Sequence, residues 1–325
     1  MEGARCSSDC HGAGAIGGCA FAAYRARGQG AERWIGYGQI RIQPSELAKL
    51  GIVLFLARIL AARPRTVNDF WRGIMPIFAI VGAAIVLVER QPDLGTAITM
   101  LLTTLIILFA AGTRPAWVAG LLAVCVLFGL GAVLKDGPDN YRFKRLTAFV
   151  NPKADELRSG YQIIHSTIAL GTGGVTGLGF GESREKRLGN LPAQRTDFIF
   201  AIIGEEFGLA GTCLVVVLFA LLAGRGLHIA QRCHDPFAAL LAIGITAMIT
   251  VQALENIGVV SASIPATGVP LPFISYGGSS LVPTLVGIGI LLNISQHPYR
   301  VDAKAAARKR REESGVAVRG VAGAR

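Results

Sequence analysis

Seven apolar segments constrain this chain more than any other feature of its sequence. Each is close to the roughly 20 residues that a helix needs to cross a hydrocarbon core about 30 Å thick. A backbone in lipid must satisfy its own hydrogen bonds, and an α-helix does so within a single segment. The sequence therefore predicts an all-α, polytopic integral membrane protein with about seven transmembrane helices. The segments are residues 45–61, 73–89, 94–111, 115–135, 198–224, 236–262 and 280–296.

The composition supports a membrane protein and argues against a nucleic-acid-binding one. Hydrophobic residues make up 52% of the 325 residues and charged residues only 16%, unlike an average soluble domain. The formal net charge is +11, but residues 299–325 alone hold eight Lys or Arg against three Asp or Glu. A basic tail after the last apolar segment is typical of a cytoplasmic terminus beside an anionic leaflet. We therefore expect a membrane partner and no nucleic acid.

Arginine-bearing connections predict the sidedness of the chain. The short connections at 62–72, 111–115 and 224–235 carry arginines and alternate along the chain with the other connections. The long loop 136–197 holds nine Lys or Arg against seven Asp or Glu, but a loop of that length escapes the positive-inside rule. The short arginine-bearing connections and the C-terminal tail are therefore placed in the cytoplasm. The outer side then receives the segment before residue 45, the turn 89–95, the long loop 136–197 and the stretch 263–279.

The chain divides into three parts on this basis. Residues 1–30 are rich in Gly, Ala and Cys and lack the apolar core of a signal peptide. We expect them to be disordered or foreign to the folded part. Residues 31–298 form the transmembrane domain, and residues 299–325 form the basic cytoplasmic tail.

Several carboxylates occur at or within the apolar segments, where lipid makes a charge costly. Sidedness places Glu46, Asp93 and Asp197 at outer, N-terminal helix ends, which favour negative charge. They are either three separate helix caps or parts of one site. We expect Glu205 and Glu206, further along the segment that follows Asp197, to be hydrogen-bonding groups in the core of the bundle.

Two further polar features lie inside predicted spans. Lys49 follows Glu46 by three residues, so both lie on one helical face. The pair indicates a functional cavity, a structural ion pair, or a lysine that snorkels toward the interface. Gln252, Glu255 and Asn256 form a polar patch that suits a hydrogen-bonded bundle core or a proton pathway, and we favour the core.

The outer segments also carry candidate ligands for an anionic substrate. Four basic residues closely precede Asp197, and cations there would keep its carboxyl ionised; a solvated mixed-charge loop is the ordinary alternative. A GGSS turn can present amides and hydroxyls to phosphate, or it is a plain loop. The candidates are Arg184, Lys186, Arg187, Arg195, Ser279 and Ser280.

Several long motifs, in this order, resemble the FtsW/RodA/SpoVE (SEDS) family. They are ERWIGYGQIRIQPSELAKL, QPDLGTA, NPKADELRSGYQIIHSTIALGTGGVTGLGFGES, LPAQRTDFIFAIIGEEFGLAG and IPATGVPLPFISYGGSSL. The stretch GESREKRLGNLPAQRTDFIFAIIGEE is more similar to the division-associated FtsW branch than to the RodA branch. Members of this family typically have about ten spans, three of them before the QPSEL helix. We therefore expect this seven-span chain to be a fragment or to have a misassigned start.

The resemblance implies an enzyme and names its site. It implies a peptidoglycan glycosyltransferase that polymerises lipid II during cell division, at the outer face of the bacterial cytoplasmic membrane. The essential aspartate of the family falls on Asp197, and its membrane Glu and Lys fall on Glu46 and Lys49. The implied partners are lipid II, undecaprenyl-pyrophosphate-linked glycan, a class B penicillin-binding protein and other divisome proteins.

The chemistry implied by the resemblance is a single inversion at an α-linked donor sugar. Asp197 is the candidate general base, and the departing pyrophosphate needs positive charge. The basic residues above, Asp93, Ser279 and Ser280 are the substrate-binding candidates. We expect no metal site and no tightly bound cofactor; assistance by Mg²⁺ or Mn²⁺ is left open.

Three other functions stay open at this point. The alternatives are a lipid II flippase or proton-coupled transporter, a RodA-type elongation polymerase, and a non-catalytic scaffold for a cell-wall synthase.

Overall fold

The structure of the chain is a computed structural model. The predicted terminal parts 1–30 and 299–325, and the candidate residue Arg195, lie outside the residues that it describes. The described residues are 35–37, 40–64, 67–89, 91, 93–135, 141–151, 159–189 and 196–296.

Helices occupy all seven of the predicted apolar segments. Four described stretches are long and apolar enough to cross a membrane by length and composition: Phe70–Glu89, Ile199–Arg232, Pro236–Val260 and Gly278–Ser295. The count of seven spans therefore stays a prediction. The helices are α2 (Pro44–Ala62), η1 (Phe70–Ile74, a π-helical turn) leading into α3 (Met75–Glu89), α4 (Leu94–Ala110), α5 (Pro115–Lys135), α9 (Ile199–Arg232), α10 (Pro236–Val260) and α11 (Gly278–Ser295).

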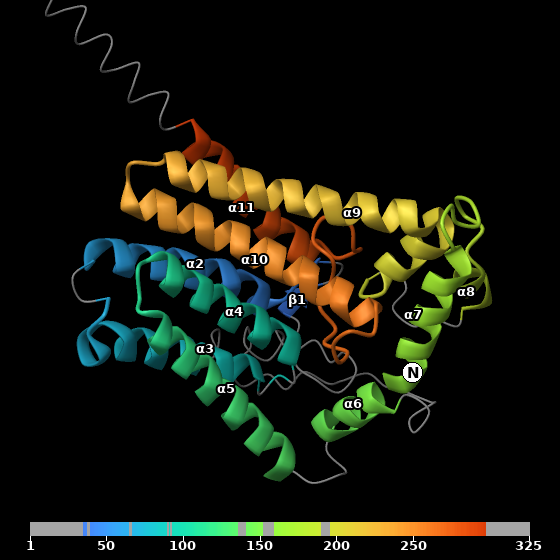
Figure 1. The fold of residues 1–325 in the computed structure, drawn as a ribbon, viewed down its shortest axis with the longest axis horizontal. Helices are drawn as coiled ribbons and strands as arrows, with labels where there is room; N and C mark the ends of the chain where they lie inside the picture. Colours follow the sequence, from blue (N-terminus) through green and yellow to red (C-terminus); the bar gives the residue numbers. More distant parts are fainter. Residues whose placement is uncertain are drawn as a thin grey trace, which may run out of the picture.

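Helix α10 is the centre of the bundle. It packs against α2, α4, α9 and α11, as Figure 1 shows. Small residues allow this close packing in a lipid-like setting. A Cβ added at Gly244 of α10 would lie 2.6 Å from Val53 of α2 and 2.8 Å from Ile107 of α4. We call the end at which α2, α4 and α11 begin and α10 ends the outer end of the bundle.

The described parts of the loop 136–197 contain three helices, which the sequence did not predict. They are α6 (Tyr141–Val150), α7 (Ser159–Gly173) and α8 (Arg184–Leu188). Helix α7 packs against α9. The structure also contains a short antiparallel hairpin that the sequence did not predict. It consists of β1 (Ile35–Tyr37) and β2 (Ile40–Ile42), with Ile35 opposite Ile42. The remaining described elements are helical, in line with the predicted class.

Helix α9 is broken at Gly208, where the sequence predicts a straight span. Gly208 has φ 65° and ψ −158°, a region open essentially to glycine alone. We call residues 199–207 the short limb and residues 209–232 the long limb. Figure 1 shows the short limb, in yellow, turning back from the long limb toward the end of α10.

Segment 174–179 supplies the hydrogen bonds that the break removes from α9. Amides of this segment donate to the last short-limb carbonyls, and its carbonyls accept from the first long-limb amides. A kink in a helix needs such a replacement for its lost internal bonds. The break is therefore built from two distant segments. The bonds are Leu178 N to Glu205 O (2.9 Å), Gly179 N to Glu206 O (3.0 Å), Leu209 N to Gly174 O (2.9 Å) and Ala210 N to Val175 O (3.2 Å).

Substitution of Gly208 by alanine is expected to destabilise the protein. The added Cβ would lie 2.5 Å from both Gly177 N and Val175 O, and the backbone strain alone costs about 1–3 kcal/mol. We expect a lower Tm in detergent, followed by helical circular dichroism. Gly224→Ala is the matched control, because nothing lies within 4 Å of its added Cβ. Equal Tm values for the two variants would contradict this account of the break.

Candidate active site

A buried ion pair lies at the start of α2. Lys49 Nζ is 2.9 Å from Glu46 Oε1 and donates to Gln252 Oε1 of α10 at 2.6 Å. Both charged residues are only 3% exposed. Snorkelling is therefore wrong for Lys49, since its ammonium group points into the bundle. Pairing and a third polar partner offset the desolvation that makes an isolated buried charge so unfavourable.

The polar patch of α10 fastens the loop that follows it. Gln252 Nε2 donates to Pro270 O at 3.0 Å. One turn later, Asn256 Nδ2 donates to Val269 O at 2.8 Å and to Asp197 O at 2.7 Å. These contacts favour the structural interpretation of the patch over a proton pathway. They also connect the ion pair to Asp197 through two successive turns of one helix.

Asp197 is anchored by its backbone while its carboxylate faces a glycine. Besides the bond from Asn256, the neighbouring Thr196 O accepts from Ser275 Oγ at 2.5 Å. A Cβ added at Gly268 would lie 3.6 Å from Asp197 Oδ2, so the carboxylate lies directly against the loop at this point. Asp197 is partly exposed. The fold thus holds an accessible carboxylate at the outer end of the bundle without using that carboxylate for the anchors described.

Asp93 acts as a helix cap in this structure. It is 4% exposed and accepts from Thr96 N at 3.3 Å and from Thr96 Oγ1 at 2.9 Å. Gln43 Nε2 also donates to it at 2.8 Å, which joins the starts of α2 and α4. The geometry favours the cap, one of the two roles that the sequence left open, over direct contact with a substrate.

The basic residues of α8 do not gather around Asp197. Lys186 Nζ is 3.6 Å from Glu206 Oε1, near the break in α9. Arg187 pairs with Glu182, and Arg184 is exposed. The Arg187–Glu182 pair is exposed on both sides, and such pairs contribute only about 0–1 kcal/mol. All three basic side chains are exposed, and Lys186 reaches a buried carboxylate, that of Glu206.

Glu205 and Glu206 are buried as predicted, but the hydrogen-bond partners of Glu205 lie at the start of α8 rather than in the core of the bundle. Glu205 is fully buried, and its carboxylate accepts from Ser183 Oγ at 2.5 Å and from Arg184 N at 2.9 Å. It thus satisfies amides at the start of α8, where helix geometry leaves donors without partners. The break at Gly208 causes the difference, because it directs the end of the short limb toward the outer loop.

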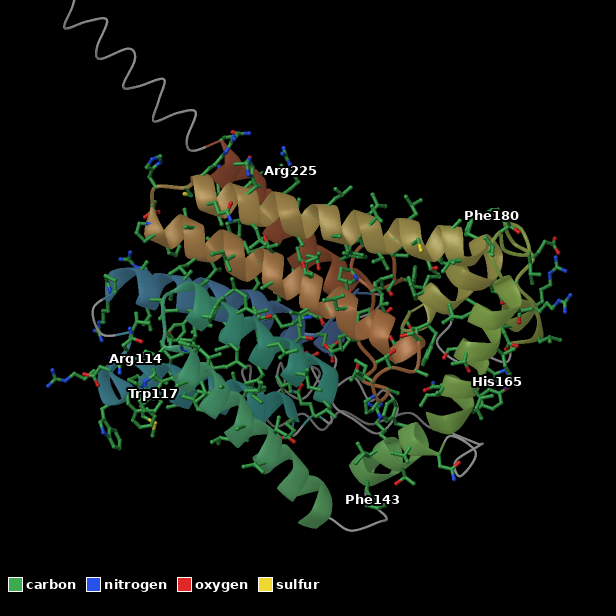
Figure 2. The ribbon with its side chains drawn as sticks, in the orientation of Figure 1. Arg114, Trp117, Phe143, His165, Phe180 and Arg225 are labelled. Atoms are coloured by element: carbon green, nitrogen blue, oxygen red, sulfur yellow. The ribbon has the colours of Figure 1, made fainter. Side chains whose placement is uncertain are left out.

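His165 joins α7 to α8. Its Nδ1 lies 2.8 Å from Glu185 Oε2, and Figure 2 labels it on α7. Arg114 lies at the opposite end of the bundle from His165 in the same view. This separation agrees with the prediction that the arginine-bearing connections and the long loop face opposite sides.

Substitution of Glu205 by glutamine is expected to loosen α8. Glutamine lacks the charge and one of the two acceptor oxygens, and a hydrogen bond to a charged group contributes about 1.5–3 kcal/mol. We expect amides 184–186 to exchange with deuterium roughly tenfold faster or more, by that estimate. Glu206→Gln is the control, because it removes only the longer contact to the exposed Lys186. Unchanged exchange in Glu205→Gln would exclude the capping role.

Comparison with known proteins decides the family. A family model described as a cell cycle protein, FtsW/RodA/SpoVE, matches residues 19–300. The chain belongs to the FtsW/RodA/SpoVE family. The resemblance found in the sequence is thereby confirmed.

Relatives of this FtsW/RodA/SpoVE chain include proteins of different cellular roles. It is 44% identical over 268 residues to stage V sporulation protein E of Bacillus subtilis, covering 82% of this chain and 72% of that protein. It is 40% identical over 267 residues to the probable peptidoglycan glycosyltransferase FtsW of Geobacter metallireducens, covering 82% and 70%.

Solved structures share the fold of this family member. A chain from a peptidoglycan synthase complex that coordinates polymerization and crosslinking has a TM-score of 0.68 and 29% identity, covering 86% of this chain and 79% of that one. The rod shape determining protein RodA of Thermus thermophilus has a TM-score of 0.59 and 28% identity, covering 88% and 77%. The helical bundle predicted from hydropathy is therefore confirmed as the fold of this family.

The remaining candidates of this family member are held inside the protein. Ser279 and Ser280 lie in the first turn of α11 at 7% and 8% exposure, and Ser280 Oγ donates to Gly277 O at 3.3 Å. A role in binding phosphate stays a prediction. In the described part of the chain, no three His, Cys, Asp or Glu side chains are grouped as metal ligands would be, so cation dependence also stays open.

The sequence did not predict the contacts that hold the loop after α10 and the segment around Asp197 in place. Arg145 of α6 donates to Ala266 O at 2.8 Å, and Ser275 and Gly268 lie against Thr196 and Asp197. None of these contacts is local in sequence. The available signal was the dense Pro, Gly and Ser content of residues 261–280, which is typical of an irregular loop.

Proposed function

We propose that this chain is a peptidoglycan glycosyltransferase that polymerises lipid II into glycan strands, with Asp197 as its general base. The observation that carries the proposal is the anchoring of Asp197. Its backbone is held by α10 and the backbone of Thr196 by Ser275, Oδ2 of its carboxylate lies beside Gly268, and the residue as a whole is partly exposed. A relative 40% identical to it is a probable peptidoglycan glycosyltransferase, which supports the assignment.

The proposed reaction is one inverting displacement. The C4 hydroxyl oxygen of a GlcNAc forms a bond to C1 of a lipid-linked MurNAc, and the bond from C1 to the pyrophosphate oxygen breaks. The hydroxyl proton passes to Asp197, and undecaprenyl pyrophosphate departs with the electron pair. A positioned carboxylate can serve as such a base if it lies within hydrogen-bond reach of the hydroxyl.

The other site residues take supporting roles in this proposal. Glu46 and Lys49 are buried, so we assign them to positioning: they hold Gln252, which holds Pro270 of the loop against Asp197. Positive charge for the departing pyrophosphate is assigned to Arg195, which precedes Asp197 by two residues; Arg184, Lys186 and Arg187 lie near the break in α9 instead.

The cellular setting is also a proposal. We place the enzyme in the bacterial cytoplasmic membrane with its C-terminus in the cytoplasm, acting in division with a class B penicillin-binding protein and other divisome proteins. The similarity to a chain of a peptidoglycan synthase complex supports such a partner. The relatives include a sporulation protein and an FtsW, so the division role rests on the loop motif.

The position of Glu205 argues against the transporter alternative. A transporter needs carboxylates that line a path through the bundle, and Glu205 instead caps α8. The test is to reconstitute the chain with a class B penicillin-binding protein and purified lipid II. Formation of glycan strands supports the proposal. Movement of labelled lipid II across the vesicle membrane without any glycan product would overturn it.

A further inference from the structure

A cavity of about 440 Å³ lies in the angle between the two limbs of α9. Phe200 and Gly204 line it from the short limb, and Cys213 and Val217 line it from the long limb. Leu170 of α7 closes one side. The cavity exists because α9 is broken, since a straight helix has no such angle.

The wall of the cavity is apolar. None of its lining residues carries a charge, and the hydroxyl of Thr212 donates back to Leu209 O at 3.0 Å within its own helix. A charged ligand would lose its hydration here without replacement. The volume is in the range of small-molecule sites, about 300–1,000 Å³. The chemistry therefore suits a hydrocarbon chain.

The cavity opens toward the surface that would face lipid. Leu209 and Val217 of the long limb are 57% and 51% exposed, within a stretch apolar enough to cross a membrane. At its other side the cavity reaches Phe200, which is 4% exposed and begins about one helical turn after Asp197. An apolar chain can thus enter from the bilayer and end at Phe200, about one helical turn from Asp197 along the chain.

We propose that this cavity binds the first isoprene units of a polyprenyl-pyrophosphate-linked sugar, and so places its sugar at Asp197. The inference rests on the proposed function, because it names the place of the lipid part of the same substrate. Two features carry it together: the uncharged, largely apolar wall that opens to lipid, and its lining by the short limb, which begins two residues after Asp197. A bilayer phospholipid and a transmembrane helix of a partner protein are the rival occupants.

The test uses an undecaprenyl phosphate analogue that carries a diazirine in its first isoprene units. The chain is reconstituted in nanodiscs and irradiated, and the adduct is mapped by mass spectrometry. We expect the label on the residues that line the cavity, and about tenfold less label when unlabelled undecaprenyl phosphate is present at about ten times its Kd. The same amount of phosphatidylglycerol is expected to leave the label unchanged.

A variant with a filled cavity is compared with a variant that carries the same substitution just outside the cavity. Val217→Trp places a large ring in the cavity and is expected to reduce labelling at least fivefold, on the order of 1 kcal/mol. Leu218→Trp is the control, because Leu218 is adjacent, 55% exposed and outside the cavity lining. If Val217→Trp fails to fold, competition in the wild-type protein still decides the question.

Several outcomes would overturn the inference. These are label away from the residues that line the cavity, equal competition by phosphatidylglycerol, and unchanged label in Val217→Trp. Loss of binding to a class B penicillin-binding protein with unchanged label would assign the cavity to a helix. Labelling requires no catalysis, so it tests the binding site separately from the proposed function. A chain that takes the label but never polymerises lipid II would overturn the proposed function and would still support the binding site.

Discussion

Asp197→Asn is expected to lower the rate of lipid II polymerisation by about 10²–10⁴-fold, the usual contribution of a general base. Asparagine has nearly the same shape but cannot accept the proton of the attacking hydroxyl. The described anchors attach to the backbone carbonyls of Thr196 and Asp197 rather than to the carboxylate. The fold is therefore expected to survive the change, and glycan strand formation from purified lipid II measures the effect.

The control for this experiment is Asp235→Asn. Asp235 caps α10 by accepting from Phe237 N and Ala238 N, at the opposite end of that helix from Asp197. We expect it to retain activity. Normal polymerisation by Asp197→Asn would instead favour the scaffold alternative, in which outer-loop changes impair assembly and this carboxylate is dispensable.

Lys49→Met is expected to destabilise the bundle by about 3–5 kcal/mol, because removal of one partner leaves a buried charge uncompensated. Glu46 is 3% exposed, and its ion pair with Lys49 at 2.9 Å would be lost. We expect a large fall in Tm and little recoverable protein in detergent. Arg58→Met is the control, since Arg58 is exposed on the same helix and its loss should have little effect.

The double variant Glu46→Gln with Lys49→Met separates stability from positioning. Two neutral side chains of similar size remove the uncompensated charge, so the fold is expected to recover most of its Tm. Without the ammonium group, Gln252 loses its partner at 2.6 Å, and the loop at Pro270 is held less firmly. We expect kcat to stay low while Tm recovers. A double variant that regains both would make the pair purely structural.

Hydropathy was sufficient to locate the helices of the bundle. Each predicted apolar segment coincides with a helix, and most boundaries agree within a few residues. The reason is physical: an apolar backbone segment in lipid has few alternatives to a helix. The pairing of Glu46 with Lys49 was predictable for a similar reason, since residues three apart on a helix always lie on one face.

The path of α9 was not predictable from its own residues. The stretch around Gly208 is apolar and would suit a continuous span. The break depends on segment 174–179, some thirty residues earlier, which supplies hydrogen bonds to both limbs. This is why the hydrogen-bond partners of Glu205 were expected in the bundle core, and why proximity in sequence suggested that the basic residues of α8 surround Asp197.

The sequence by itself determined which segments form helices, which end of the bundle carries Glu46, Asp93 and Asp197, and which family the chain belongs to. These are properties of hydropathy, loop charge and ordered motifs, all readable along the chain. Only the tertiary structure decided that Asn256 and Ser275 anchor Asp197, that Glu205 caps α8, and that a bent α9 encloses an apolar cavity. Those features arise from hydrogen bonds between distant segments, which no local pattern in the sequence specifies.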